Sequence, residues 1–240
     1  MTPPMPYRSL NADRIEATIE TLQKRIDERF PNRGLSKLCQ QLLEIAREDK
    51  RKLAWVAKPN IWLRVGVGAA IALGAVGLIG FAFTLPIFRV EGEVSNVLQG
   101  VDAAVNTIAL SGAASWFLLN LESRWRRRAV LNDLHELRSI AHVVDMHQLT
   151  KDPTQLAKNY SSTASSQTHD MSEFELIRYL DYCSEMLSLT GKLAALYMQN
   201  MRDPVVIESV NEIEDLTTSL SRKIWQKIMI LSQPTRTWGQ

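Results

Sequence analysis

The segment 134–148 carries the residues whose types and spacing come closest to a metal site. His135 and His142 are seven positions apart and Asp145 follows three positions later, so all three fall near one face of a helix. Imidazole and carboxylate groups at such spacing can bind a transition metal. A complete site needs further ligands from another helix, and no segment supplies an obvious set. Because histidines beside a helix-packing seam are more often surface residues, we expect no metal and no other cofactor.

The sequence lacks the motifs of well-known catalytic sites. G-x-S-x-G, HExxH, Walker A and kinase-like sets do not occur in it. Tyr179, Tyr182 and Tyr197 fall in one predicted helix, where packing explains them better than catalysis. Cys39 and Cys183 lie far apart without a CxxC or Cys/His spacing, which argues against a disulfide framework or a zinc site. We therefore expect a protein that is not an enzyme.

Basic residues gather most densely at one point of the chain, in a group that we call the arginine cluster. Its members are Arg124, Arg126, Arg127 and Arg128. The formal net charge is only +2, which is little basic surface for a nucleic-acid-binding protein. Adjacent arginines beside an apolar stretch are typical of contact with anionic lipid headgroups. The cluster therefore predicts a membrane surface and no nucleic-acid partner.

The apolar residues concentrate between Ile61 and Leu121, ahead of the arginine cluster. Residues 65–88 contain no charged side chain and include five of the eleven glycines. At about 1.5 Å per residue, a helix over this stretch is about 36 Å long, and a hydrocarbon core is about 30 Å thick. A dinucleotide-binding loop needs glycine at the sixth motif position, which is Ile71 when counted from Gly66. Residues 65–88 therefore predict a first membrane span.

Small residues of this span form a stripe, which we call the glycine stripe. Gly66, Ala70, Gly74, Gly77 and Gly80 fall within about 120° of one another on a helical wheel. Small side chains let a second membrane helix approach closely, so the stripe predicts transmembrane packing. The alternative is that glycine and alanine are simply frequent in membrane helices.

A second predicted span, 103–121, is uncharged but more polar than the first. Asp102, Asn106 and Asn120 share one helix face with Ala113, and we call this set the polar face. Polar groups at membrane depth usually face protein or water, so the polar face is expected to meet the glycine stripe of the same or a neighbouring subunit. In the alternative interpretation, Asp102 and Asn120 only contact headgroups at the ends of the span.

The basic residues around the two spans predict their orientation. Six of them precede the first span: Arg47, Lys50, Arg51, Lys52, Lys58 and Arg64. The arginine cluster follows the second span, whereas the turn between the spans carries only Arg89, beside Glu91 and Glu93. Both termini are therefore expected in the cytoplasm, with a short acidic turn on the other side. The layout resembles two-span bacterial membrane proteins, which implies an inner membrane but no function.

The expected fold class is an all-α integral membrane protein with a two-helix transmembrane hairpin and a cytoplasmic, coiled-coil-like helical bundle. Its predicted parts are amphipathic N-terminal helices (1–60), the membrane hairpin (61–122), a cytoplasmic helix continuing the second span (123–149), a flexible linker (150–172), an antiparallel helical hairpin (173–232) and a tail (233–240). Ser172 and Glu175 fit a capping box, and Asp203-Pro204 fits the start of a helix. Apolar residues in 173–232 follow a four–three spacing, which Thr217 and Lys227 interrupt.

This layout favours a membrane scaffold or coupling protein. It would contact the lipid bilayer, form a homo-oligomer and bind unidentified protein partners through its helices. A soluble bundle with residues 65–88 as its core helix is a further alternative.

A competing function is that of a subunit in an oligomeric cation channel or transporter. Glu91, Glu93 and Asp102 would then attract cations at the mouth, and Asn106 would line the path. The layout is similar to that of the mitochondrial calcium uniporter, which also places two spans between helical coils. The acidic motif that the uniporter carries at the start of its second span is not found in "VSNVLQGVDAAVN".

Overall fold

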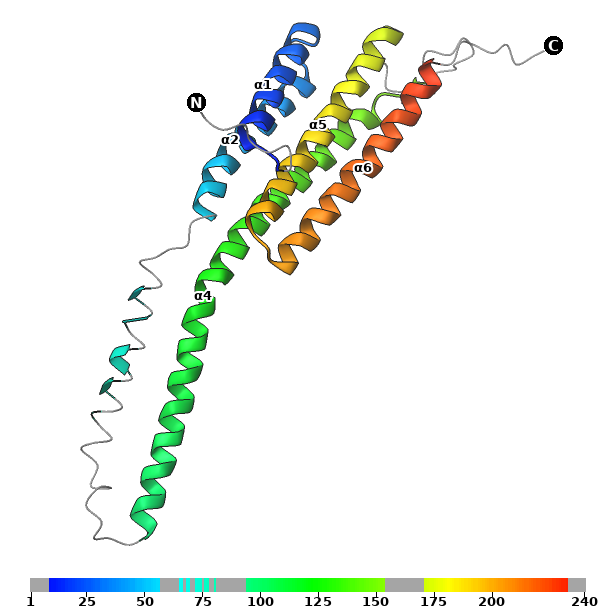
Figure 1. Cartoon of the computed structure of the whole chain (residues 1–240). Helices are drawn as coiled ribbons and strands as arrows, with labels where there is room; N and C mark the ends of the chain where they lie inside the picture. Colours follow the sequence, from blue (N-terminus) through cyan, green and yellow to red (C-terminus); the bar gives the residue numbers. More distant parts are fainter. Residues whose placement is uncertain are drawn as a thin grey trace, which may run out of the picture. The chain divides into compact units, whose positions relative to one another are not determined.

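The computed structural model describes residues 9–56, 94–153 and 171–232, together with residues 65, 66, 68, 69, 72–74, 76, 77 and 80 (Figure 1). Its helices are α1 (Ala12–Arg29), α2 (Gly34–Val56), α4 (Val94–Leu149), α5 (Glu173–Asn200) and α6 (Pro204–Ser232). The described ranges contain no strand, which confirms the all-α class for them. Among the helical residues so described, none form a helix that is both long and apolar enough to cross a membrane.

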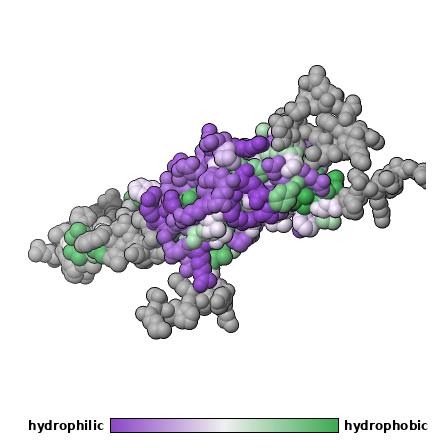
Figure 2. Space-filling model, turned by 90° about the horizontal axis from the view of Figure 1, so that it is seen from above, coloured by the Kyte–Doolittle hydropathy of each residue, from purple (hydrophilic) through white to green (hydrophobic). Residues whose placement is uncertain are grey.

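The chain divides into two compact units. One unit comprises residues 1–57 and 129–240, and the other comprises residues 58–128. We call the described part of the first unit the bundle: α1, α2, α5, α6 and the residues of α4 from Ala129 onward. The bundle has a hydrophobic core to which all five helices contribute. Outside this core, the surface of the described residues seen in Figure 2 is largely hydrophilic.

Helices α1 and α2 are joined by a tight turn at residues 30–33. The α1 N-cap is Asn11, whose Oδ1 accepts hydrogen bonds from the backbone N–H groups of Asp13 (2.8 Å) and Arg14 (3.2 Å). In the turn, Asn32 adopts a φ of 59°, a left-handed conformation that asparagine tolerates better than most residues. At the start of α2, a Cβ on Gly34 would lie 2.5 Å from His147 Cε1, so the missing side chain admits the end of α4.

Helices α5 and α6 run antiparallel and lie side by side (Figure 1). The capping box predicted at the start of α5 is present, because Ser172 Oγ accepts from Glu175 N and Ser172 N donates to Glu175 Oε2. At the start of α6, Asp203 Oδ1 accepts from Val205 N at 3.0 Å. Both helix starts are therefore fixed by the residues that the sequence indicates.

Contacts between helices and with the helix backbone account for the two residues that interrupt the apolar spacing of α6. Thr217 is buried and donates from Oγ1 to the carbonyl oxygen of Glu214 at 3.1 Å. A Cβ on Gly191 of α5 would lie 3.1 Å from Thr217 Oγ1, so glycine allows close approach there. Lys227 Nζ donates to the carbonyl oxygens of Gln148 (2.7 Å) and Lys151 (3.3 Å), and thereby caps the end of α4.

Candidate functional site

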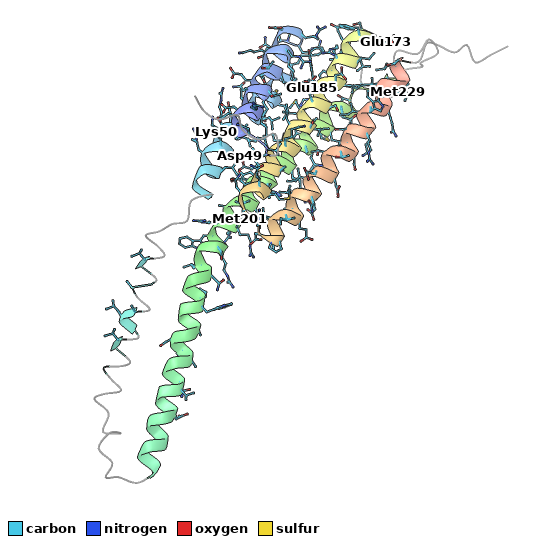
Figure 3. The ribbon with its side chains drawn as sticks, in the orientation of Figure 1. Asp49, Lys50, Glu173, Glu185, Met201 and Met229 are labelled. Atoms are coloured by element: carbon cyan, nitrogen blue, oxygen red, sulfur yellow. The ribbon has the colours of Figure 1, made fainter. Side chains whose placement is uncertain are left out.

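A cluster of polar side chains lies buried where α2, α4 and α5 meet, and we call it the carboxylate cluster. Its buried members are Asp49 of α2 (2% exposed), Asp133 of α4 (5%) and Tyr197 of α5 (0%). The Tyr197 hydroxyl oxygen lies 2.6 Å from Asp49 Oδ1 and 3.0 Å from Asp133 Oδ2. Lys52 of α2 completes the cluster, because its Nζ donates to Asp133 Oδ1 at 2.6 Å. In Figure 3, the labelled Asp49 marks the position of the cluster on α2.

The two carboxylates of the cluster have unequal surroundings. Asp133 has both oxygens within hydrogen-bonding distance of a partner, Lys52 on one side and Tyr197 on the other. Asp49 Oδ2 is buried and has no hydrogen-bond partner among the described residues. Buried polar atoms of this kind are uncommon and costly, especially when the group is charged. The charge of Asp133 is thus better compensated by hydrogen-bond donors than that of Asp49. Burial therefore disfavours the ionised form of Asp49 more strongly.

The pKa values of the cluster follow from this environment. Burial raises the pKa of Asp49 to about 7, with repulsion from Asp133 adding to the effect and the hydrogen bond with Tyr197 opposing it. Burial by itself lowers the pKa of Lys52, but the hydrogen bond to Asp133 and the nearby negative charges outweigh it, so the net pKa is raised. Burial, together with the two carboxylates, raises the pKa of Tyr197. The cluster therefore holds a carboxyl group that titrates near neutral pH.

A groove of about 640 Å³ is a second candidate site in the bundle. It lies between the start of α1, the middle of α5 and the last turns of α6. Its floor is apolar, with Ile15, Leu189 and Ile228 nearly buried, while Trp225 is 60% exposed at its edge. Charged residues of both signs complete the lining: Arg14, Asp181, Glu185 and Lys192. Such a lining is typical of a surface that contacts another amphipathic surface.

A third hollow, of about 430 Å³, is lined by Arg25, Arg29 and Arg178, and two of these arginines are paired with carboxylates. Arg25 and Arg178 lie over the ring of Tyr182, at 5.1 and 5.2 Å from its centroid. Arg25 donates to both oxygens of Glu185, at 2.7 and 3.1 Å, and Arg178 donates to Asp181 at 3.0 Å. The guanidinium charges of Arg25 and Arg178 are therefore already compensated by carboxylates, which reduces the attraction of these two residues for an anion.

The glycine stripe is only partly described. Gly66, Gly74, Gly77 and Gly80 are helical, and a Cβ on any of them would lie more than 4 Å from every described atom beyond its chain neighbours and its own helix backbone. Ala70 lies outside the described residues. No neighbouring helix is therefore seen against the described members of the stripe, and the packing seam stays a prediction.

The polar face falls on one side of α4, at the register that the sequence predicts. Asp102, Asn106 and Ala113 are exposed, whereas Asn120 is half-buried and donates from Nδ2 to the carbonyl oxygen of Trp116 at 2.7 Å. Asn120 thus bonds to its own helix. Glu91 and Glu93, which the channel hypothesis places at the mouth, lie outside the described residues.

Large apolar residues flank the polar face and are exposed. They are Val105 (58%), Leu110 (73%), Trp116 (64%) and Phe117 (51%). At 100° per residue, Val105 and Trp116 lie on one side of the polar face, and Leu110 and Phe117 lie on the other. This part of α4 therefore presents a narrow polar strip between two apolar strips.

The arginine cluster also lies on α4, next to an exposed tryptophan. Arg124 and Arg128 are exposed, and Arg126 and Arg127 are half-buried and make contacts of their own. Trp125 is 67% exposed. A combination of arginine and tryptophan is typical of the interface between a membrane and water.

The histidine pair of α4 does not form a centre with other ligands in the described residues. His135 and His142 are exposed, and Asp145 Oδ1 accepts a hydrogen bond from Gln148 Nε2 at 2.7 Å. Across the described ranges, no group of three or more His, Cys, Asp or Glu side chains is placed to hold a metal ion. The structure thus does not bring these three residues together as ligands.

Sequence reasoning missed the carboxylate cluster, although a signal for it exists. Asp49 falls on the apolar face of α2, between the buried Ala46 and Leu53, and Asp133 sits beside Leu134 in the buried seam of α4. A carboxylate at a core position is unusual and predicts a buried partner.

Comparison with protein families, with curated proteins and with solved structures found no match to this chain.

Proposed function

We propose that this chain is a non-enzymatic integral membrane protein with a two-helix hairpin formed by residues 65–88 and 103–121. The bundle lies in the cytoplasm, both termini are on that side, and an inner membrane is the location. The protein acts as a scaffold or coupling element through helical protein–protein contacts, in a homo-oligomer. It has no cofactor and no nucleic-acid partner.

One observation carries this proposal: the two units differ in how far their apolar side chains are exposed. The bundle buries its apolar helix faces, with Ile19, Leu22 and Leu42 at most 1% exposed. In residues 58–128, the described large apolar residues other than the half-buried Leu121 are at least half exposed: Val65, Leu73, Val76, Val105, Leu110, Trp116, Phe117 and Trp125. Exposing apolar area to water costs about 25 cal/mol per Å², a cost that hydrocarbon removes. Large exposed apolar surfaces mark membrane or protein contact sites.

The scaffold role rests on what the bundle offers to a partner. Tyr179, Tyr182 and Tyr197 are core residues, at most 3% exposed, so they are not placed to meet a substrate. The groove beside Trp225, of about 640 Å³, is a concave surface, and exposed tryptophans are frequent anchors at protein interfaces. These features favour binding over catalysis.

Membrane extraction of charge-bearing variants tests the proposal. The unmodified chain is expected to stay in the membrane pellet during carbonate extraction. A double variant, Leu73→Arg with Val76→Arg, is expected to be released, because an arginine in the middle of a span costs about 2.5–3.5 kcal/mol. The matched control is Val143→Arg with Met146→Arg, which alters exposed apolar residues of the bundle and should leave the protein in the pellet. Release of the unmodified chain would contradict membrane insertion.

The alternative function, a cation channel or transporter subunit, draws on the polar face between its two apolar strips. Asp102 and Asn106 are exposed on α4, as residues that line a water-filled path must be. In liposomes, Asp102→Ala and Asn106→Ala should then abolish conductance and leave assembly intact. A scaffold conducts no ions in the same assay.

A further inference from the structure

We propose that the carboxylate cluster is a proton-operated latch: a proton on Asp49 holds the C-terminal half of α2 against α4 and α5, and loss of this proton weakens that attachment. The latch lies wholly within the bundle, so it does not depend on the membrane function proposed above.

The first argument is the number of donors available to the buried oxygens. Tyr197 has a single O–H, yet its oxygen lies 2.6 Å from Asp49 and 3.0 Å from Asp133. When both carboxylates are ionised, this hydroxyl can donate to only one of them. The oxygen of the other carboxylate then faces the Tyr197 oxygen without a hydrogen between them, and the two oxygens repel each other. A proton on Asp49 removes the conflict, because the carboxyl O–H then donates to the Tyr197 oxygen and Tyr197 donates to Asp133. The result is a continuous chain from Asp49 to Lys52 through Tyr197 and Asp133.

The second argument is the charge that surrounds Asp49 from each packed helix. On α4, Asp133 and Glu136 are both negative and oppose ionisation of Asp49. On α2, Lys52 is positive, but its Nζ is placed 2.6 Å from Asp133 and 4.0 Å from Glu48. On α5, Tyr197 is neutral. One half-exposed lysine thus faces several carboxylates, and Asp133 is the one that it contacts most closely.

The basic residues of α2 that face α1 do not compensate the charge of Asp49 either. Lys50, next to Asp49 in the sequence, extends to α1, where its Nζ contacts Asp13 and lies 3.0 Å from Glu16. Arg47 Nε also donates to Glu16, at 3.2 Å. These ion pairs tie α2 to α1 at the surface, whereas the carboxylate cluster ties the C-terminal half of α2 to α4 and α5. Ionisation of Asp49 therefore weakens one specific side of α2.

The burial of Asp49 sets the pH at which the latch operates. Its pKa lies at about 7, so the proton is lost over a physiological range. Residues 49–56 form the last two turns of α2, and the chain enters the second unit at Lys58. The latch acts on the segment of the bundle that leads directly to that unit.

Hydrogen exchange of the full-length chain tests the latch. After correction for the intrinsic pH dependence of exchange, the amides of residues 46–56 are expected to exchange about tenfold faster at about pH 8 than at about pH 6. Asp49→Asn mimics the protonated carboxyl and should remove this difference. Glu44→Gln is the matched control, because it removes an exposed carboxylate from the same helix and should retain the difference.

A wild-type profile identical to that of Asp49→Asn would overturn the latch. If Asp49→Asn fails to fold, the unmodified chain still gives a decision by infrared difference spectroscopy. The latch requires the carbonyl stretch of a protonated buried carboxyl at about pH 6, and this band must disappear at about pH 8. A spectrum without such a band at the lower pH would contradict the protonated state.

Discussion

Asp49 is a residue through which pH acts on the bundle. Its pKa in the folded chain, about 7, lies above its ordinary value of 3.8, because the charged form is poorly accommodated in the core. At pH values between 3.8 and about 7, Asp49 is therefore protonated in the folded state and ionised in the unfolded state. The free energy of unfolding is accordingly largest at the acidic end of this window, as far as this group is concerned.

Stability should fall as the pH rises from about 4 to about 7 and should level off above that, as far as Asp49 contributes. Denaturant unfolding of the full-length chain over this range measures the effect. Asp49→Asn should flatten the profile in this window, and Glu44→Gln should follow the unmodified chain. The raised pKa of Asp49 would be contradicted if the stability of the unmodified chain rises with pH through this window and Asp49→Asn gives the same profile.

The hydroxyl of Tyr197 should be worth about 1–3 kcal/mol, because Tyr197→Phe leaves two buried carboxyls without their shared partner. The loss should be smaller in an Asp49→Asn background, where one of the two carboxylates is already neutral. A double-mutant cycle on unfolding free energies measures this coupling. Additive effects of the two substitutions would show that the residues act independently.

At the scale of the elements, helix ends are fixed by local residues and helix contacts by distant ones. The capping box of α5 and the start of α6 depend on neighbours within four residues, so the sequence predicts them. The roles of Asp49, Asp133 and Lys227 depend on which faces of different helices meet. A single sequence marks these residues as exceptions to the apolar pattern but does not identify their partners. The candidate site was for this reason harder to predict than the helices.

Lys227 provides a test at the same scale, because it caps one helix from another. Lys227→Met should lower the free energy of unfolding by about 1–2 kcal/mol, since the carbonyl oxygens of Gln148 and Lys151 lose their donor. Thermal or denaturant unfolding measures the change. Lys223→Met, at an exposed position of the same helix, should change stability little. Equal effects of the two substitutions would mean that the cap adds nothing.

At the scale of the whole molecule, the chain combines a bundle with a buried apolar core and a second unit with exposed apolar residues. The all-α class follows from composition and periodicity and is confirmed for the described residues. The membrane hairpin rests on the uncharged stretch 65–88, much of which lies outside those residues, and on the basic residues around it. It stays a proposal that a topology experiment can decide.

Cysteine labelling in intact cells is the most direct measurement of this proposal. The native Cys39 and Cys183 are buried, and burial raises the pKa of each thiol to about 12, so both react slowly. Single cysteines can replace Ser9 and Ser232, near the two termini, and Glu93 in the predicted turn. A membrane-impermeant reagent should label position 93 from outside, and should label positions 9 and 232 only after the membrane is opened. Labelling of positions 9 and 232 from opposite sides, or recovery of the chain in the soluble fraction, would contradict the hairpin.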